Sequence, residues 1–129
     1  MNRQLYSGLI HTWYIDESGS RNEWTYIVHK CILHSDIIII EFTGSKDGYK
    51  FSGGMHAKRD KPGVYLGNGG YLDDVPRQDQ FDRLIFVEIT AEKIDTDLVI
   101  EGYWRQDNQD GKGSFDYQME GSLSLSHPS

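Results

Sequence analysis

The chain has 129 residues, a formal net charge of −7 and a single cysteine, Cys31. This length is typical of one domain that buries a real core, so folding needs no metal, and a lone cysteine excludes an intramolecular disulfide. The negative charge repels phosphate backbones, so we expect no nucleic-acid partner.

The N-terminal residues lack the apolar segment of a signal peptide, and no apolar run approaches the roughly 20 residues that a membrane helix needs. We therefore expect a cytoplasmic location and no membrane partner. The lone cysteine also fits a reducing compartment.

Eight apolar-rich stretches of strand length follow one another, and most of the breaks between them are turn chemistry. Consecutive strands joined by short turns are antiparallel neighbours, and eight strands can close a small barrel. We therefore predict an all-β, single-domain, up-and-down antiparallel β-barrel over residues 1–129. The expected strands, read with their turns, are Gln4–Ile15, Glu23–His34, Asp36–Thr43, Tyr49–Lys58, Gly63–Leu72, Phe81–Thr90, Leu98–Arg105 and Gly113–Ser124.

Alternation along the later strands predicts which side chains face the interior. In the seventh stretch, Leu98, Ile100, Gly102 and Trp104 share one face, and Glu101 lies on the other. A period of two with one apolar face indicates a strand between a core and water. The glycines of the run 67–70 lack the helix that a phosphate-binding loop requires, so we expect a bent strand or a close backbone approach there.

Three segments are apolar on both faces, namely strand one, Ile37–Ile40 and Leu84–Val87, so the face that does not meet the lumen must be covered by another subunit or a packed tail. Ile37–Ile40 shows this most clearly. We expect the outer faces of strands one to three to form the contact of a homo-oligomer. The outward residues are expected to be Leu9, Trp13, Ile27, Ile37 and Ile39.

A row of polar residues across the first three strands is one candidate for chemistry. A symmetric first hairpin places His11 opposite His29, and a tight second hairpin places His29 opposite Glu41, with Cys31 beside them. Two imidazoles and a carboxylate suit a zinc or iron site or a proton relay. Alternatively, these are ordinary polar residues on the outer face.

The aromatic residues are the second candidate. A symmetric turn at 108–111 pairs Trp104 with Phe115, Gly102 with Tyr117 and Ile100 with Met119. An aromatic lumen suits a small apolar ligand, although the same side chains can simply fill the barrel. The predicted ligand-binding residues are Tyr49, Phe51, Met55, Trp104, Phe115, Tyr117 and Met119.

The eight-strand meander resembles the lipocalin and avidin-like barrels in architecture. Lipocalins carry Gly-x-Trp on the first strand, whereas here Gly8 and Trp13 are five apart and the motif occurs as Gly102-Tyr103-Trp104. The resemblance implies a lumen for a small hydrophobic or planar ligand and, for avidin-like members, oligomers built through the barrel wall. Fatty-acid-binding proteins insert two helices after strand one, for which the turn 16–22 leaves no room.

These patterns leave three classes of function open. The leading hypothesis is a barrel that binds a small apolar or aromatic molecule without a cofactor. The second is an enzyme of the isomerase, hydratase or metal-dependent type that uses His11, His29 and Glu41. The third is a non-catalytic protein-interaction module.

Overall fold

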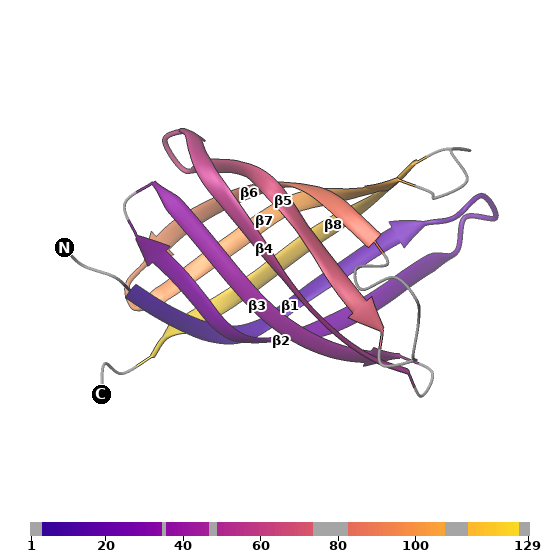
Figure 1. The fold of residues 1–129 in the computed structure, drawn as a ribbon, viewed down its shortest axis with the longest axis horizontal. Coiled ribbons are helices and arrows are strands. Elements are labelled where there is room, and N and C mark those ends of the chain that lie inside the picture. Colours follow the sequence, from indigo (N-terminus) through magenta and orange to yellow (C-terminus); the bar gives the residue numbers. More distant parts are fainter. Residues whose placement is uncertain (1–3, 35, 47–48, 74–82, 108–113, 127–129) are drawn as a thin grey trace.

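A computed structural model shows one closed barrel in which each strand pairs antiparallel with the next and β8 pairs with β1 (Figure 1). The structure describes residues 4–34, 36–46, 49–73, 83–107 and 114–126. The strands are β1 (Gln4–Ile15), β2 (Arg21–His34), β3 (Ile37–Lys46), β4 (Tyr49–Lys61), β5 (Val64–Asp73), β6 (Arg83–Ile94), β7 (Asp97–Asp107) and β8 (Ser114–Leu125). The predicted fold class is confirmed, and an eight-stranded antiparallel barrel is consistent with the architecture of the lipocalin and avidin-like barrels.

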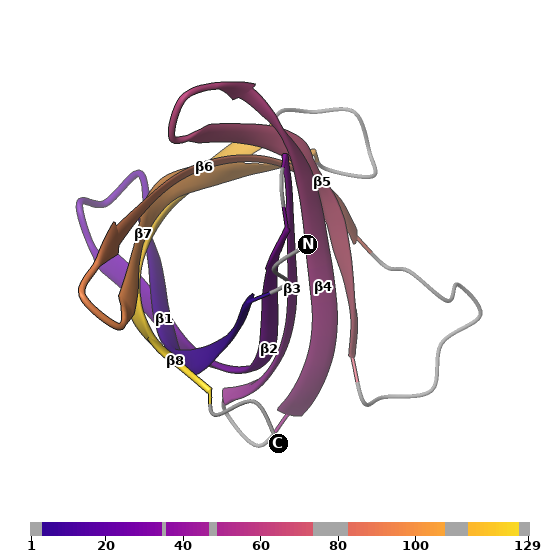
Figure 2. The ribbon, with the colours of Figure 1, turned by 90° about the vertical axis from the view of Figure 1, so that its left-hand side faces the viewer.

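The two ends of the barrel differ. At one end of the barrel, β1 begins, β8 ends and the chain makes the β2–β3, β4–β5 and β6–β7 connections (Figure 1). The β1–β2 hairpin extends from the opposite end. Viewed from the terminal end, the strands form a ring around one interior (Figure 2). Within the described part of the chain, no helix is long and apolar enough to cross a membrane.

The interior is the hydrophobic core, and side-chain alternation decides which residues enter it. On β7, Leu98, Ile100 and Trp104 are at most 1% exposed, whereas Glu101 between them is exposed. The predicted inward face of this strand is therefore confirmed. Buried residues from all eight strands form one cluster, and in β1 the buried polar residue Thr12 belongs to the same inward series as Ile10.

Close backbone contact explains the glycines of β5. A Cβ on Gly67 would lie 2.0 Å from the carbonyl oxygen of His56 on β4, and a Cβ on Gly69 would lie 2.5 Å from that of Gly54. No side chain fits at such distances, so the expected close approach at residues 67–70 is confirmed at these two positions.

The outer surface of strands β1–β3 carries the apolar residues expected there. Leu9 is 48% exposed, Ile27 is 50% exposed and Ile37 is 39% exposed, while Trp13 and Ile39 are partly exposed. Leu9 and Ile27 are directly opposed across the β1–β2 ladder, so their side chains are neighbours on this outer face.

The β7–β8 register differs from the predicted one by two residues. Trp104 pairs with Tyr117, Gly102 with Met119 and Ile100 with Gly121, not with Phe115, Tyr117 and Met119 respectively. A shift by two preserves the faces, because side chains alternate with a period of two. The inward assignment of Ile100, Trp104 and Met119 is therefore correct despite the wrong register.

Candidate ligand-binding site

Aromatic side chains gather inside the barrel toward the end that carries the β1–β2 turn. The rings contact one another in a continuous set, with centroids from 4.9 Å apart for Tyr14 and Tyr117 to 6.4 Å apart for Phe42 and Trp104. We call this set the aromatic cluster. Its members are Tyr14, Trp24, Tyr26, Phe42, Trp104 and Tyr117.

The strand pattern places these rings. Tyr14 lies near the end of β1 and Trp24 near the start of β2, so the hairpin brings both to the same end of the barrel. Tyr14 continues the inward series of Ile10 and Thr12, and Trp24 continues that of Tyr26. Each is therefore aromatic at a position where alternation directs its ring into the lumen.

The cluster has a buried floor. Trp104 is 1% exposed, Phe42 is 2% exposed and Tyr26 is 5% exposed. The ring of Tyr26 lies 4.9 Å from that of Phe42 and 5.4 Å from that of Trp104. These three side chains are packed as core, and they close the cluster toward the middle of the barrel.

The cluster also has a rim of three partly exposed rings. Tyr14, Trp24 and Tyr117 contact one another pairwise, at centroid distances of 5.7 Å, 4.9 Å and 5.6 Å. Tyr14 and Trp24 are stacked with an angle of 18° between their planes, and Tyr117 meets both edge-on. Rings with solvent on one side and a hydrophobic floor on the other suit a flat apolar molecule that stacks on them.

The structure places the predicted ligand-binding residues in two groups. Met55, Trp104 and Met119 are buried in the core, and Tyr117 is partly buried in the rim. The side chains of Tyr49, Phe51 and Phe115 lie outside the described residues. The prediction did not include Tyr14, Trp24, Tyr26 and Phe42, although their places in the alternation of β1, β2 and β3 were a signal for them.

The first half of the predicted histidine row is wrong. His11 pairs with Thr25, not with His29, and its Nδ1 lies 3.1 Å from the Thr25 hydroxyl. The position of the turn explains the difference. The Asp16 N–H donates to the Ser20 carbonyl, which closes the hairpin at residues 16–20. A pairing of the two histidines would need a turn that lies further along the chain. A change of turn length moves every pair of a hairpin.

The second half is also wrong. Lys30, not His29, pairs with Glu41, and the ladder shifts between Val28 and Lys30. His29 lies at this irregularity, where its Nε2 is 2.6 Å from the Thr43 hydroxyl. An extra residue in one strand displaces all later pairs, and its position is not visible in the alternation.

The histidines are therefore separate exposed residues, each hydrogen-bonded to a threonine on the next strand. Among the described residues, no group of three or more His, Cys, Asp or Glu side chains could hold a metal ion. Cys31 is buried, and this burial raises the pKa of its thiol to about 12. A thiol that stays protonated is a poor nucleophile.

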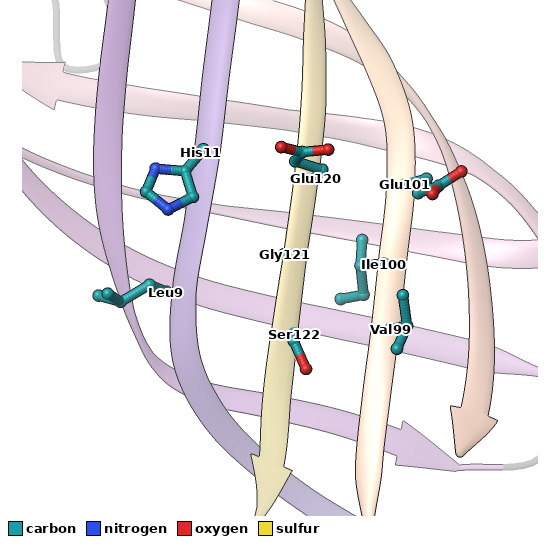
Figure 3. Close-up of a pocket in the computed structure, with 8 residues that line it drawn as sticks. All are labelled: Leu9, His11, Val99, Ile100, Glu101, Glu120, Gly121 and Ser122. Carbon is teal, nitrogen blue, oxygen red and sulfur yellow. The ribbon is translucent and has the colours of Figure 1, made fainter.

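A shallow groove of about 390 Å³ lies on the outside of the barrel over β7, β8 and β1 (Figure 3). Gly121 and Ser122 lie along its centre on β8, between larger side chains of β1 and β7. His11, Glu120 and Glu101 form one cross-strand row at one end, and Leu9 and Val99 lie at the other. Leu9, His11, Glu101 and Glu120 are exposed on the outer surface, so the groove meets solvent, whereas the floor of the aromatic cluster is buried.

Comparison with known proteins adds no relative. No protein-family model, no curated protein and no solved structure matches the chain.

Proposed function

We propose that the protein binds a small planar molecule, apolar or aromatic, at the aromatic cluster. The observation that carries this proposal is the arrangement of six contacting rings as a buried floor and a partly exposed rim at one end of the lumen. Binding sites for small apolar molecules are concave and mostly aromatic, with a few polar groups for orientation. The tyrosine hydroxyls and indole N–H groups supply such polar groups.

The charge of the chain narrows the ligand further. A net charge of −7 gives the protein a negative potential, which disfavours an anionic ligand. A neutral or cationic aromatic molecule is the better fit, because the faces of tryptophan and tyrosine rings also attract cations. This ligand class agrees with the architectural resemblance to lipocalin and avidin-like barrels, which is an analogy of fold.

The three tryptophans allow a direct test. Trp24 and Trp104 belong to the cluster, whereas Trp13 lies on the outside of β1, with the guanidinium of Arg21 4.5 Å from its ring centre. Titration of nitrogen-15-labelled protein with 2-naphthol should move the indole signals of Trp24 and Trp104 in a saturable way. The signal of Trp13 should stay in place.

Matched variants complete the test. Trp24→Ala should weaken 2-naphthol binding about tenfold or more, since full burial of a large apolar side chain is worth about 1.5–3 kcal/mol and each 1.4 kcal/mol is about tenfold in affinity. Trp13→Ala should leave binding unchanged. Absence of saturation at Trp24 and Trp104, or an equal response from Trp13, would overturn the proposal.

The other two classes of function have less support. The enzymatic hypothesis depended on a row of His11, His29 and Glu41, and these residues are not brought together in this way. A pure interaction module would require no saturable response of the interior tryptophans, so the same titration distinguishes it from a binding barrel.

A further inference from the structure

Thr12 is a buried polar residue directly below the rim of the aromatic cluster. It is 0% exposed, and its Oγ1 has no hydrogen-bond partner within the part of the chain that the structure describes. A buried hydroxyl without a partner destabilises a fold, because it has lost its bonds to water and gained none. Such a group calls for an explanation.

The register places this hydroxyl beneath the rim. Thr12 is opposed by Trp24 on one side and by Met119 on the other, and all three face the interior. Tyr14 follows Thr12 by two residues on β1, toward the turn, and Tyr117 precedes Met119 by two residues on β8. Thr12 is therefore next to all three rim positions, either along its own strand or across a ladder.

Resting on the proposed function, we infer that Thr12 determines specificity by hydrogen-bonding a polar group of the bound aromatic molecule. The rim and floor hold the flat apolar part, and the hydroxyl at their base accepts or donates one hydrogen bond. The ligand class is then an aromatic ring that carries a hydroxyl, amine or carbonyl at the edge that enters first. A purely hydrocarbon ring would leave Thr12 unsatisfied.

The size of this effect follows from the cost of a missing hydrogen bond. A site with a buried polar group discriminates against an analogue that cannot pair with it, since the group is otherwise left alone. For one neutral hydrogen bond we expect a preference of about three- to tenfold for the polar ligand.

Two probes of nearly the same shape measure this preference. 2-Naphthol carries a hydroxyl where 2-methylnaphthalene carries a methyl group, so the pair differs by one hydrogen-bonding group. Wild-type protein should bind 2-naphthol about three- to tenfold more tightly. Thr12→Val should remove the preference by weakening 2-naphthol alone, and Thr12→Ser should restore it.

A stability measurement separates ligand recognition from a structural role. Thr12→Val replaces a hydroxyl by a methyl group of the same shape, so the melting temperature should stay the same or rise. A clear fall would mean that the hydroxyl has a partner in the fold, and would overturn the inference. Equal binding of both probes, unchanged by Thr12→Val, would overturn the inference alone, whereas binding of neither probe would overturn the proposed function as well.

Discussion

Truncation of Trp104 tests the assignment of the barrel interior. The indole is 1% exposed and contacts Tyr26, Phe42 and Tyr117, at centroid distances of 5.4 Å, 6.4 Å and 5.5 Å. Trp104→Ala removes these contacts and leaves a cavity that rings from other strands cannot easily fill. Substitutions of this kind cost about 3–5 kcal/mol.

Urea unfolding can resolve a loss of this size. A domain of this length has a free energy of unfolding of about 5–15 kcal/mol, so the variant should still fold at 25 °C. With a denaturant slope of about 2 kcal/mol per molar urea, a loss of about 4 kcal/mol lowers the midpoint by about 2 M. The slope itself should change little if the folded state keeps its barrel.

Tyr103→Ala is the matched control. Tyr103 is the neighbour of Trp104 on the outer face, where it is partly exposed and lies 6.4 Å from the ring of Phe86. Its truncation should cost about 1 kcal/mol or less, since much of its surface already meets water. If Tyr103→Ala proved the more damaging change, the faces of β7 would be inverted and the proposed site would be wrong with them.

Three further predictions concern other parts of the barrel. Gly102→Ala should destabilise the protein by about 1–3 kcal/mol or more, because the new Cβ would lie 2.0 Å from the Glu88 carbonyl oxygen. In the same urea assay, the control Gly54→Ala should stay within about 1 kcal/mol of wild type, because its nearest contact is at 3.2 Å. Hydrogen bonds from the turn lower the pKa of Asp16 to about 2, so its stabilising contribution should be present above about pH 4 and lost as the pH falls toward 2. Asp16→Asn should abolish this loss of stability between pH 4 and pH 2 in acid unfolding curves. The protein should be a dimer or tetramer by light scattering, and Ile27→Lys on the exposed face of β2 should give monomers; a monomeric wild type at high micromolar concentration would contradict this.

The reason for the Gly102 prediction differs from the one that the sequence suggests. A symmetric β7–β8 turn would bring Tyr117 across this glycine, but Met119 is its partner. The limiting contact comes from the other side, where the backbone of β6 approaches. The same intolerance is expected, now from backbone packing against β6.

Faces were predictable from the sequence where a strand is regular, because they then depend only on whether a position is odd or even. This is why Trp104 and Met119 are buried as expected although their predicted partners were wrong. The prediction failed in β2, where the irregularity between Val28 and Lys30 breaks the alternation, so Cys31 is buried in the core and not beside His11 and His29. Strand order was predictable for a similar reason, since short turns leave consecutive strands little choice but to pair.

Register was not predictable, because it depends on details of one or two residues. The Asp16 turn is stabilised by hydrogen bonds to its carboxylate from the Ser18 and Ser20 N–H groups, at 2.9 Å each. These local bonds set the pairing of the whole hairpin and separate His11 from His29. The irregularity at His29 then displaces Glu41.

Side-chain contacts across the lumen are harder still to predict from a sequence. Tyr26 on β2 and Trp104 on β7 are not on neighbouring strands, yet their rings are 5.4 Å apart. Such a contact depends on the tilt and stagger of the closed barrel, which strand patterns do not encode directly. The aromatic cluster was therefore only partly predictable, through the inward positions of its members.

The adjacent residues His11 and Thr12 explain why the interior is the better place to seek function. His11 looks the more reactive in the sequence, but it faces outward and shares a hydrogen bond with Thr25 in contact with water. Thr12 faces inward, where its hydroxyl is buried below three aromatic rings. A hydrogen bond discriminates between ligands mainly where water cannot replace the missing partner, so a modest hydroxyl inside the barrel can select a ligand more sharply than an imidazole outside it.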